Sequence, residues 1–168
     1  MRVVALSDTH LTPTSKRRLP PRATALLAGA DVILHAGDVV TGELLEELAA
    51  FAPVHAVLGN NDHSLRGVLP EVLELDVGGV SVAMVHDSGP TAGRPARLLR
   101  RFPAAGLVVF GHSHVPVLVE GVAGQRLCNP GSPTQRRAQP HHTMAVLELE
   151  DGAVRAGEIV VVDEEPGR

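Results

Sequence analysis

The feature that most constrains this chain is a pattern that occurs five times, in which a short apolar segment is followed at once by acidic, amide or histidine residues. The apolar segments have the length and the Val, Leu and Ile content that are typical of buried strands. The carboxyl ends of parallel strands meet at one edge of a sheet, so polar residues at these ends come together. The polar segments are Asp8-Thr9-His10, Gly37-Asp38, Gly59-Asn60-Asn61-Asp62, His86-Asp87 and Gly111-His112-Ser113-His114.

The first third of the chain alternates strands and helices. A strand at residues 3–6 precedes a helical segment at 22–29, a strand within 31–38, a helix at 42–51 and a strand within 54–62. In the second of these helices the apolar residues recur at helical spacing, and a proline follows its end. This alternation predicts a parallel sheet with right-handed crossover connections.

The second half of the chain is richer in antiparallel strands. Gly78-Gly79 lies between two apolar segments, and Asp151-Gly152 divides the last apolar stretch in the same way, so each pair predicts a hairpin. A helix is expected at 95–102 and a buried strand at 107–110. We therefore expect an α/β fold in which two sheets pack face to face and the helices lie outside them.

The length and composition indicate one domain. With 168 residues, of which 44% are hydrophobic, the chain has the size and composition of a single globular domain. We place this domain at residues 1–162 and expect a loose tail at 163–168. No apolar stretch is long enough for a membrane helix and no signal-peptide pattern opens the chain, so we expect a cytoplasmic protein. Cys128 is the single cysteine, which excludes a disulfide within the chain.

The charge and the aromatic content argue against nucleic acid as the partner. The formal net charge is −4, with no long run of either sign. Nucleic-acid binders usually show a basic patch, and single-strand binders use aromatic side chains, whereas this chain has three Phe and no Trp or Tyr. These features weaken a nuclease function but do not exclude a nucleotide as a small substrate.

Taken together, the residues at the five strand ends form a set of metal ligands. Each one alone has a structural interpretation, such as a turn residue or a buried histidine, but five coincidences are much less plausible. The set contains two carboxylates, one amide oxygen, four imidazoles and no thiolate, a mixture that suits Mn²⁺, Fe²⁺ or Zn²⁺. Seven ligands are too many for one tetrahedral ion and fit two ions. They are Asp8, His10, Asp38, Asn60, His86, His112 and His114.

The chemistry of such a set is that of attack at phosphorus. Two ions about 3.5–4 Å apart, bridged by a carboxylate, support in-line displacement, and a water between them loses its proton near neutral pH. The direction of the side chains of His112 and His114 decides whether both can reach such a site. In an extended segment residues i and i+2 point to the same side, so His112 and His114 would face one cluster while Ser113 faces away.

In their order along the chain, the five motifs resemble those of the calcineurin-like metallophosphoesterases. The short length looks most like the small bacterial and archaeal phosphodiesterase branch, and the segment CNPGSPTQRR at 128–137 is similar to the end of that branch. The resemblance covers about residues 1–160. It implies a four-layer α/β/β/α sandwich of two mixed sheets with a metal site at the carboxyl ends of the strands.

The resemblance also implies which residue binds which ion. Asp8, His10 and His114 would bind one ion, and Asp38 would bridge the two ions. The other ligands of the second ion would be Asn60, His86 and His112. The two histidines after residue 111 would then serve different ions.

Function and cofactors follow from the same resemblance. The chain is expected to hydrolyse a small phosphoester, most simply a phosphodiester, by a hydroxide that bridges two divalent ions. Mn²⁺ is the first expectation, and Fe²⁺, Ni²⁺ or Zn²⁺ are alternatives. Asp38, Asn60 and His112 would act in catalysis, and Asn61 and Asp62 would support the ligands or contact the substrate.

Two residues depart from the family pattern. Many larger members have His directly after the Asn ligand, where it protonates the leaving group, but this chain has Asn61, and an amide is not an acid. Either another group or water supplies the proton, or the leaving group hardly needs one. Asp87 stands where the family often has Gly after His86, which bears on the local backbone.

Rival functions belong to other classes. A retromer subunit of eukaryotes has this fold and works mainly by binding partners, so a protein-interaction scaffold is the main alternative. The complete ligand set favours an enzyme over a scaffold. A phosphomonoesterase and a metal-dependent nuclease are further alternatives, and apolar edge strands in the second half make a homodimer conceivable.

Overall fold

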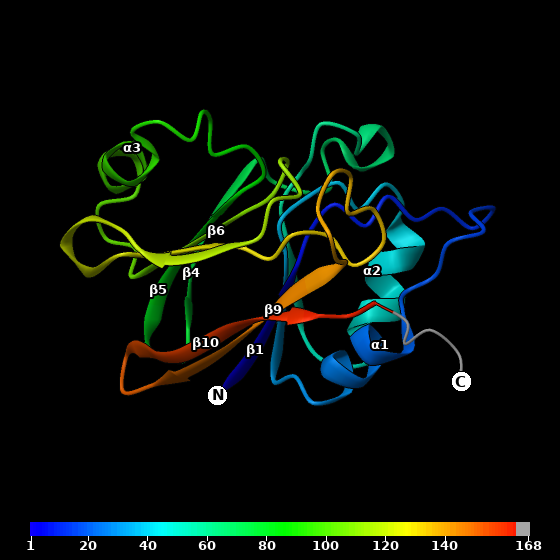
Figure 1. The fold of residues 1–168 in the computed structure, drawn as a ribbon, viewed down its shortest axis with the longest axis horizontal. Helices are drawn as coiled ribbons and strands as arrows, with labels where there is room; N and C mark the ends of the chain where they lie inside the picture. Colours follow the sequence, from blue (N-terminus) through cyan, green and yellow to red (C-terminus); the bar gives the residue numbers. More distant parts are fainter. Residues whose placement is uncertain (164–168) are drawn as a thin grey trace.

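The computed structural model describes residues 1–163, in which two five-stranded sheets pack face to face (Figure 1). Of the predicted tail at 163–168, the described part contains only Asp163, whose carboxylate accepts hydrogen bonds from the side chains of His141 and His142. The prediction for residues 164–168 lies outside the described residues.

The first sheet contains the three parallel strands that the alternating pattern predicts. Its strand order is β10-β9-β1-β2-β3. β1 pairs with β2, and β2 with β3, in parallel, while β9 and β10 form an antiparallel hairpin on the other side of β1. The strands are β1 (Arg2–Leu6), β2 (Val32–His35), β3 (Val54–Ala56), β9 (Thr143–Glu150) and β10 (Ala153–Val161).

The second sheet is also mixed, with the order β4-β5-β6-β8-β7. β5, β6 and β8 run parallel in its centre, and β4 and β7 pair antiparallel at its two edges. The predicted hairpin at Gly78-Gly79 joins β4 to β5. The strands are β4 (Val72–Val77), β5 (Val80–Val85), β6 (Leu107–Phe110), β7 (Val117–Glu120) and β8 (Arg126–Asn129).

The α-helices cover the outer faces of the sheets, which confirms the predicted four layers. They are α1 (Pro21–Ala28), α2 (Gly42–Ala49) and α3 (Arg94–Arg101). Leu27 of α1 and Leu48 of α2 pack on the first sheet, and Leu98 of α3 packs on the second. Figure 1 shows α3 on the opposite side of the sheets from α1 and α2. Among the described residues, no helix has the length and apolar character needed to cross a membrane.

Apolar side chains fill the space between the sheets. β6 reads Leu-Val-Val-Phe and is buried along its whole length, as expected for a central strand covered on both faces. Leu34 of the first sheet and Met84 of the second belong to this layer, together with Cys128. Burial raises the pKa of the Cys128 thiol to about 12, so this residue serves as a packed apolar side chain.

The packing of the sheets brings the polar segments after β1, β2, β3, β5 and β6 to one edge. Within the first sheet, the backbone N–H of Asp8 donates to the carbonyl of Gly37 at 2.9 Å. Within the second sheet, the N–H of Gly111 donates to the carbonyl of His86, also at 2.9 Å. Between the sheets, the N–H of His112 donates to Asp8 Oδ2 at 3.0 Å. The fold therefore joins all these segments into one site.

Candidate metal centre

The seven predicted ligand residues lie together at this edge, in two groups separated by Asp38. We call Asp8, His10 and His114 the closed group, because Asp8 and His114 are buried and His10 is nearly so. We call Asn60, His86 and His112 the open group, because all three line a pocket.

Three ligand atoms of the closed group converge without hydrogen bonds. One ligand atom from each of these residues lies within 4.8 Å of the other two. Among residues 1–163, Asp8 Oδ1, His10 Nε2 and His114 Nε2 are buried and have no hydrogen-bond partner. His114 Nε2 is 3.2 Å from Asp8 Oδ1, and the two imidazoles stack with 5.5 Å between their centroids. Leaving a buried polar atom unpaired costs about 1–3 kcal/mol. Three such atoms aimed at one point therefore fit a bound cation.

Backbone carbonyls orient two of the imidazoles. His114 Nδ1 donates to the carbonyl of Gln135, and His86 Nδ1 donates to the carbonyl of Ala36 at 2.7 Å. A hydrogen bond of this kind at one ring nitrogen directs the lone pair of the other nitrogen toward a metal. The hydrogen bond at His114 Nδ1 leaves its Nε2 free to face a metal, whereas His86 Nε2 makes a second hydrogen bond, to Asn60 Oδ1.

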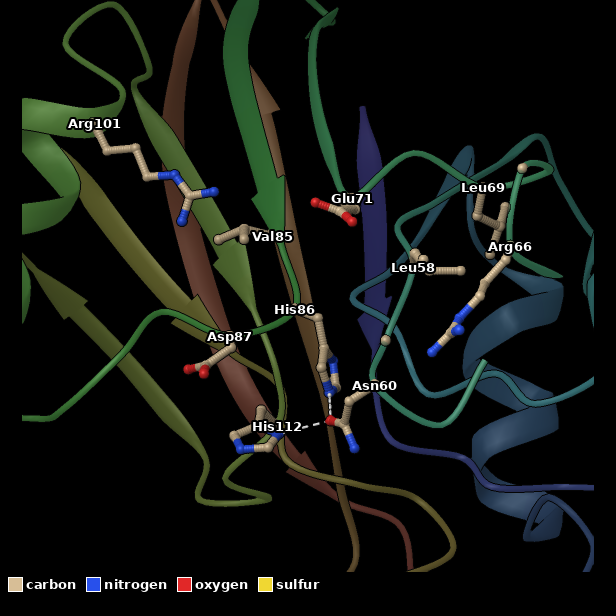
Figure 2. A pocket seen from close by; sticks show the side chains of 12 residues that line it. Leu58, Asn60, Arg66, Leu69, Glu71, Val85, His86, Asp87, Arg101 and His112 are labelled. Atoms are coloured by element: carbon tan, nitrogen blue, oxygen red, sulfur yellow. Dashed lines mark hydrogen bonds between the residues drawn. The ribbon is translucent and has the colours of Figure 1, made fainter. Parts of the chain in front are cut away.

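The open group is held together by the side-chain oxygen of Asn60. Asn60 Oδ1 accepts hydrogen bonds from His86 Nε2 at 3.0 Å and from His112 Nδ1 at 2.9 Å (Figure 2). His86 donates from both ring nitrogens only as an imidazolium. Burial opposes that charge, but Asp38 and Asp8 outweigh it and raise the pKa of His86. The surrounding carboxylates thus favour positive charge at the His86 ring.

Asp38 lies between the two groups. Its Oδ2 is 3.5 Å from His10 Nε2 of the closed group and 3.5 Å from His86 Nε2 of the open group. Asn61 donates to Asp38 twice, from its backbone N–H at 2.8 Å and from its side-chain amide at 2.7 Å. Burial would raise the pKa of Asp38, but the hydrogen bonds from His86 and Asn61 lower it well below its usual range. Asp38 is therefore a fixed anion within reach of both groups.

Asp62 holds together the two backbone segments that carry Asp38 and Asn60. Its carboxylate accepts hydrogen bonds from the backbone N–H groups of Asp38 at 3.0 Å, Val40 at 2.6 Å and Gly59 at 2.7 Å. These bonds tie the segment after β2 to the segment after β3. Asp62 thus contacts backbone N–H groups on both segments, whereas Asn61 contacts the side chain of Asp38 directly.

The backbone at the ligands adopts left-handed conformations. Their φ angles are 55° for Asp8, 46° for His10, 57° for Asp38, 66° for His112 and 58° for His114. The expectation of an extended segment from His112 to His114 is therefore wrong. Left-handed backbone costs a residue with a side chain about 1–2 kcal/mol, and such conformations concentrate at functional sites.

The motif glycines are explained by close approach. A Cβ at Gly59 would lie 2.1 Å from the backbone nitrogen of Asp38, and a Cβ at Gly111 would lie 1.9 Å from Ser7 Oγ. Neither space admits a methyl group. The glycines before Asn60 and His112 allow the ligand segments of neighbouring strands to touch.

Electrostatics favour anionic carboxylates and a neutral His10 in the closed group. Burial would raise the pKa of Asp8, but the nearby imidazoles of His114 and His86 and the hydrogen bond from Ser7 Oγ lower it. Burial lowers the pKa of His10 in spite of Asp38 and Asp8. His35 is fully buried against Thr9 Oγ1 at 3.0 Å, and burial lowers its pKa to about 3, so it stays neutral. His35 is therefore a packed side chain outside the cluster.

A pocket of about 680 Å³ opens beside the open group (Figure 2). Besides the ligands, its walls include Arg66, Glu71, Asp87 and Arg101. None of the sequence motifs includes Arg66, Glu71 or Arg101. The roles of the carbonyls of Ala36 and Gln135 could not be predicted either, because any residue type presents a backbone carbonyl.

Comparisons with known proteins agree with this geometry. A family model described as the calcineurin-like phosphoesterase superfamily domain matches residues 1–152. A protein of Methanothermobacter thermautotrophicus described as a probable metallophosphoesterase is 31% identical over 162 residues, covering 95% of this chain and 92% of the relative.

Two solved structures illustrate the likeness of fold. Vps29 of Entamoeba histolytica, solved in complex with Zn²⁺, has a TM-score of 0.75 at 22% identity, covering 97% of this chain and 100% of that one. The structure of a novel archaeal phosphodiesterase has a TM-score of 0.73 at 18% identity, covering 96% of this chain and 99% of that one. At these identities the likeness concerns the fold alone. Together with the family model and the archaeal relative, the ligand set at the strand ends leads to one conclusion: the chain belongs to the calcineurin-like phosphoesterase superfamily.

Proposed function

We propose that this protein is a phosphodiesterase that works with two divalent ions, Mn²⁺ first among them. The observation that carries the proposal is the position of Asp38, whose Oδ2 lies 3.5 Å from an imidazole nitrogen of each ligand group. A carboxylate placed between two sets of ligands is the bridge that a two-ion site requires. When bound, two such ions activate water for attack at phosphorus and neutralise charge on the phosphoryl oxygens.

The residues of the chain divide the work. The closed group would hold the first ion, since its three atoms have no other partner. The open group would hold the second ion, and Asp38 would contact both. Asn60 and His112 also reach the pocket, where a phosphoester enters, so they would act in catalysis next to the reacting phosphorus. Asn61 and Asp62 would hold Asp38 in position.

The experiment that tests the proposal uses metal-free protein prepared with a chelator and then loaded with Mn²⁺. Hydrolysis of bis(p-nitrophenyl) phosphate and p-nitrophenyl phosphate is measured for the wild type, Asp38→Ala and His112→Ala. Asp76→Ala and His141→Ala are matched controls, because both residues are exposed and outside the cluster. We expect Mn²⁺ to restore diesterase activity in the wild type and the controls and in neither cluster variant.

Two other results would change the proposal. A preference for p-nitrophenyl phosphate would keep the site and make the protein a phosphomonoesterase. Two ions bound per chain without hydrolysis, in Mn²⁺, Fe²⁺, Ni²⁺ or Zn²⁺, would favour a protein-interaction scaffold. The scaffold alternative has its own support, because this chain shares its fold with Vps29 at 22% identity.

A further inference from the structure

Building on the proposed phosphodiesterase function, we infer that the substrate is a phosphoanhydride diester, because the pocket beside the open group places two free arginines opposite each other and supplies no general acid. In such a substrate the bond that breaks joins two phosphate groups, and each phosphate carries an organic substituent. The inference names the substrate class of the same site.

The pocket has the size of a small-molecule site. Its volume of about 680 Å³ lies within the range of about 300–1,000 Å³ that is usual for ligand pockets. The open group forms one end, and Leu58, Leu69 and Val85 contribute apolar wall. A phosphate at the open group would therefore have its substituents in this pocket.

Two arginines enter the pocket from opposite walls. Arg101 is the last residue of α3, and Arg66 follows the short 3₁₀ helix His63–Leu65; Figure 2 shows both guanidinium groups directed inward. Neither makes a hydrogen bond or an ion pair within residues 1–163. The Arg101 guanidinium lies 5.0 Å from the centre of the Phe102 ring, which leaves its N–H groups available.

Two separated guanidinium groups suit a substrate with more than one phosphate. Arginine binds phosphate by charge-assisted, often bidentate hydrogen bonds. An ordinary phosphodiester has one negative charge, which the ions at the cluster would already meet. A phosphoanhydride diester has a second charged phosphate, which needs a cation farther along the pocket. The exposed carboxylates Glu71 and Asp87 also line the walls, where they suit hydroxyl groups of a sugar substituent.

The pocket also lacks a group that protonates the leaving oxygen. The side-chain amide of Asn61 donates to Asp38, and an amide does not act as an acid. Arginine does not release a proton at neutral pH, and Glu71 and Asp87 are exposed carboxyl groups, which supply hydrogen-bond acceptors. Among the described residues that line this pocket, the remaining acid-base groups are the proposed ligands His86 and His112.

A phosphate leaving group removes the need for an acid. In an alkyl diester an alkoxide departs, and it requires a proton at once. In the anhydride the bond from phosphorus to the bridging oxygen breaks, and the departing phosphate monoester keeps the electron pair. Its second pKa is about 6, so it is stable as a dianion at neutral pH. The oxygen of water forms the new bond to phosphorus, and its two protons pass to solvent, giving two phosphate monoesters.

The test compares two substrates that carry the same two adenosines. Diadenosine 5′,5′-diphosphate contains the anhydride, and adenylyl-3′,5′-adenosine contains an alkyl diester. Each is incubated with the Mn²⁺-loaded wild-type protein. General acid catalysis is worth about 10²–10⁴-fold, so we expect kcat/KM for the anhydride to exceed that for the alkyl diester by at least about 100-fold. Equal rates, or a faster alkyl diester, would overturn the inference.

Substitutions test the missing acid and the two arginines separately. Asn61→His introduces an acid next to Asn60, and we expect it to narrow the ratio between the anhydride and the alkyl diester. Arg66→Ala and Arg101→Ala should each lower kcat/KM for the anhydride more than for bis(p-nitrophenyl) phosphate. Arg100→Ala is the matched control, since Arg100 is exposed on α3, does not line the pocket, and should leave both rates unchanged.

A second measurement covers the case in which Asn61→His fails to fold. The p-nitrophenyl and phenyl esters of thymidine 5′-monophosphate differ in the acidity of the leaving phenol. Without a general acid, the wild-type protein should hydrolyse the p-nitrophenyl ester faster by about 100-fold or more. Similar rates for the two esters would show that a proton donor acts and would overturn the inference. Hydrolysis of bis(p-nitrophenyl) phosphate alone would keep the phosphodiesterase and reject the anhydride, whereas no hydrolysis of any ester would reject both.

Discussion

The closed and open groups use similar side chains in different surroundings. In the closed group, three buried ligand atoms have no hydrogen-bond partner among the described residues, which costs the metal-free protein free energy of folding. In the open group, Asn60 satisfies His86 and His112, and all three border the pocket. Because of this difference, we expect the closed group to hold an ion more tightly than the open group.

The largest effect is expected where the two groups meet. Asp38→Asn removes the negative charge that both groups share and keeps the shape of the side chain. Loss of a shared ligand removes several kcal/mol of transition-state stabilisation, so kcat/KM for bis(p-nitrophenyl) phosphate should fall on the order of 10³-fold. Steady-state kinetics with Mn²⁺ measure the fall, with Asp76→Asn as an exposed control. A loss below about tenfold would mean that the two groups work without a common carboxylate.

The next effect concerns the support beneath both groups. Asp62→Ala leaves the buried N–H groups of Asp38 and Gly59, and that of Val40, without their acceptor. Unpaired buried donors cost about 1–3 kcal/mol, and partial relaxation limits the sum, so the free energy of unfolding should fall by about 3 kcal/mol. Urea denaturation of the metal-free protein measures this fall.

An exposed aspartate provides the comparison for Asp62. Asp76 accepts one hydrogen bond, from the N–H of Gly79 at 2.9 Å in the turn between β4 and β5. Because water can replace that acceptor, Asp76→Ala should cost less than about 1 kcal/mol. Equal losses for the two variants would show that Asp62 contributes no more than a surface turn.

Ion binding should distinguish the groups by thermal stability. A ligand at about 100 times its dissociation constant adds about 2.7 kcal/mol, which for a chain of this size corresponds to a rise in Tm of about 5–10 °C. We expect Mn²⁺ to give this rise in the wild type, most of it to be lost in His114→Ala, and at least half of it to remain in His112→Ala. Scanning calorimetry with and without chelator measures the difference within each variant, so any loss of stability from the substitution itself cancels.

The stoichiometry of bound ions supplies the check on that result. Each of the two variants should bind one ion per chain where the wild type binds two. If His112→Ala lost the larger part of the Tm rise, the open group would bind its ion more tightly than the closed group, which would contradict the expectation.

The clustering of the candidate ligands could be predicted from the sequence because these residues follow strands whose ends the fold brings together. Asp8 and Asp38 follow two paired strands of the first sheet, and His86 follows a strand of the second, so the packing of the two predicted sheets completes the cluster. The walls of the pocket could not be predicted. Arg66 follows a 3₁₀ turn and Arg101 ends a helix, so their directions depend on the packing of the two sheets rather than on a local pattern.

The left-handed backbone conformation at the candidate ligands could not be predicted from the sequence either. Left-handed φ angles are expected at glycine, yet His112 and His114 adopt them with full side chains. The contacts that enforce these angles come from distant segments, such as the bond from His114 to the carbonyl of Gln135. Local propensity carries no signal for such a constraint, since tertiary contacts impose it.

The smallest expected effect is the pH dependence of the stability of the metal-free protein, because the contributions of His86 and His10 change in opposite directions with pH. The carboxylates raise the pKa of His86 in the open group, so its contribution to stability is present below the usual histidine pKa of about 6.5 and is lost as pH rises through the folded value. Burial lowers the pKa of His10 in the closed group, so acidification below about 6.5 costs stability there.

NMR titration of the imidazoles, with metal removed, separates these opposing contributions. His86 should titrate above free histidine and His10 below it, and Zn²⁺ should abolish both titrations because protons and metal compete for the same nitrogens. Titration of both residues on the same side of free histidine would contradict the contrast between the groups. Opposite shifts would mean that each group already holds, before any ion arrives, the charge balance that its position requires: the closed group stays unprotonated and ready, whereas the open group keeps a proton that the second ion must displace.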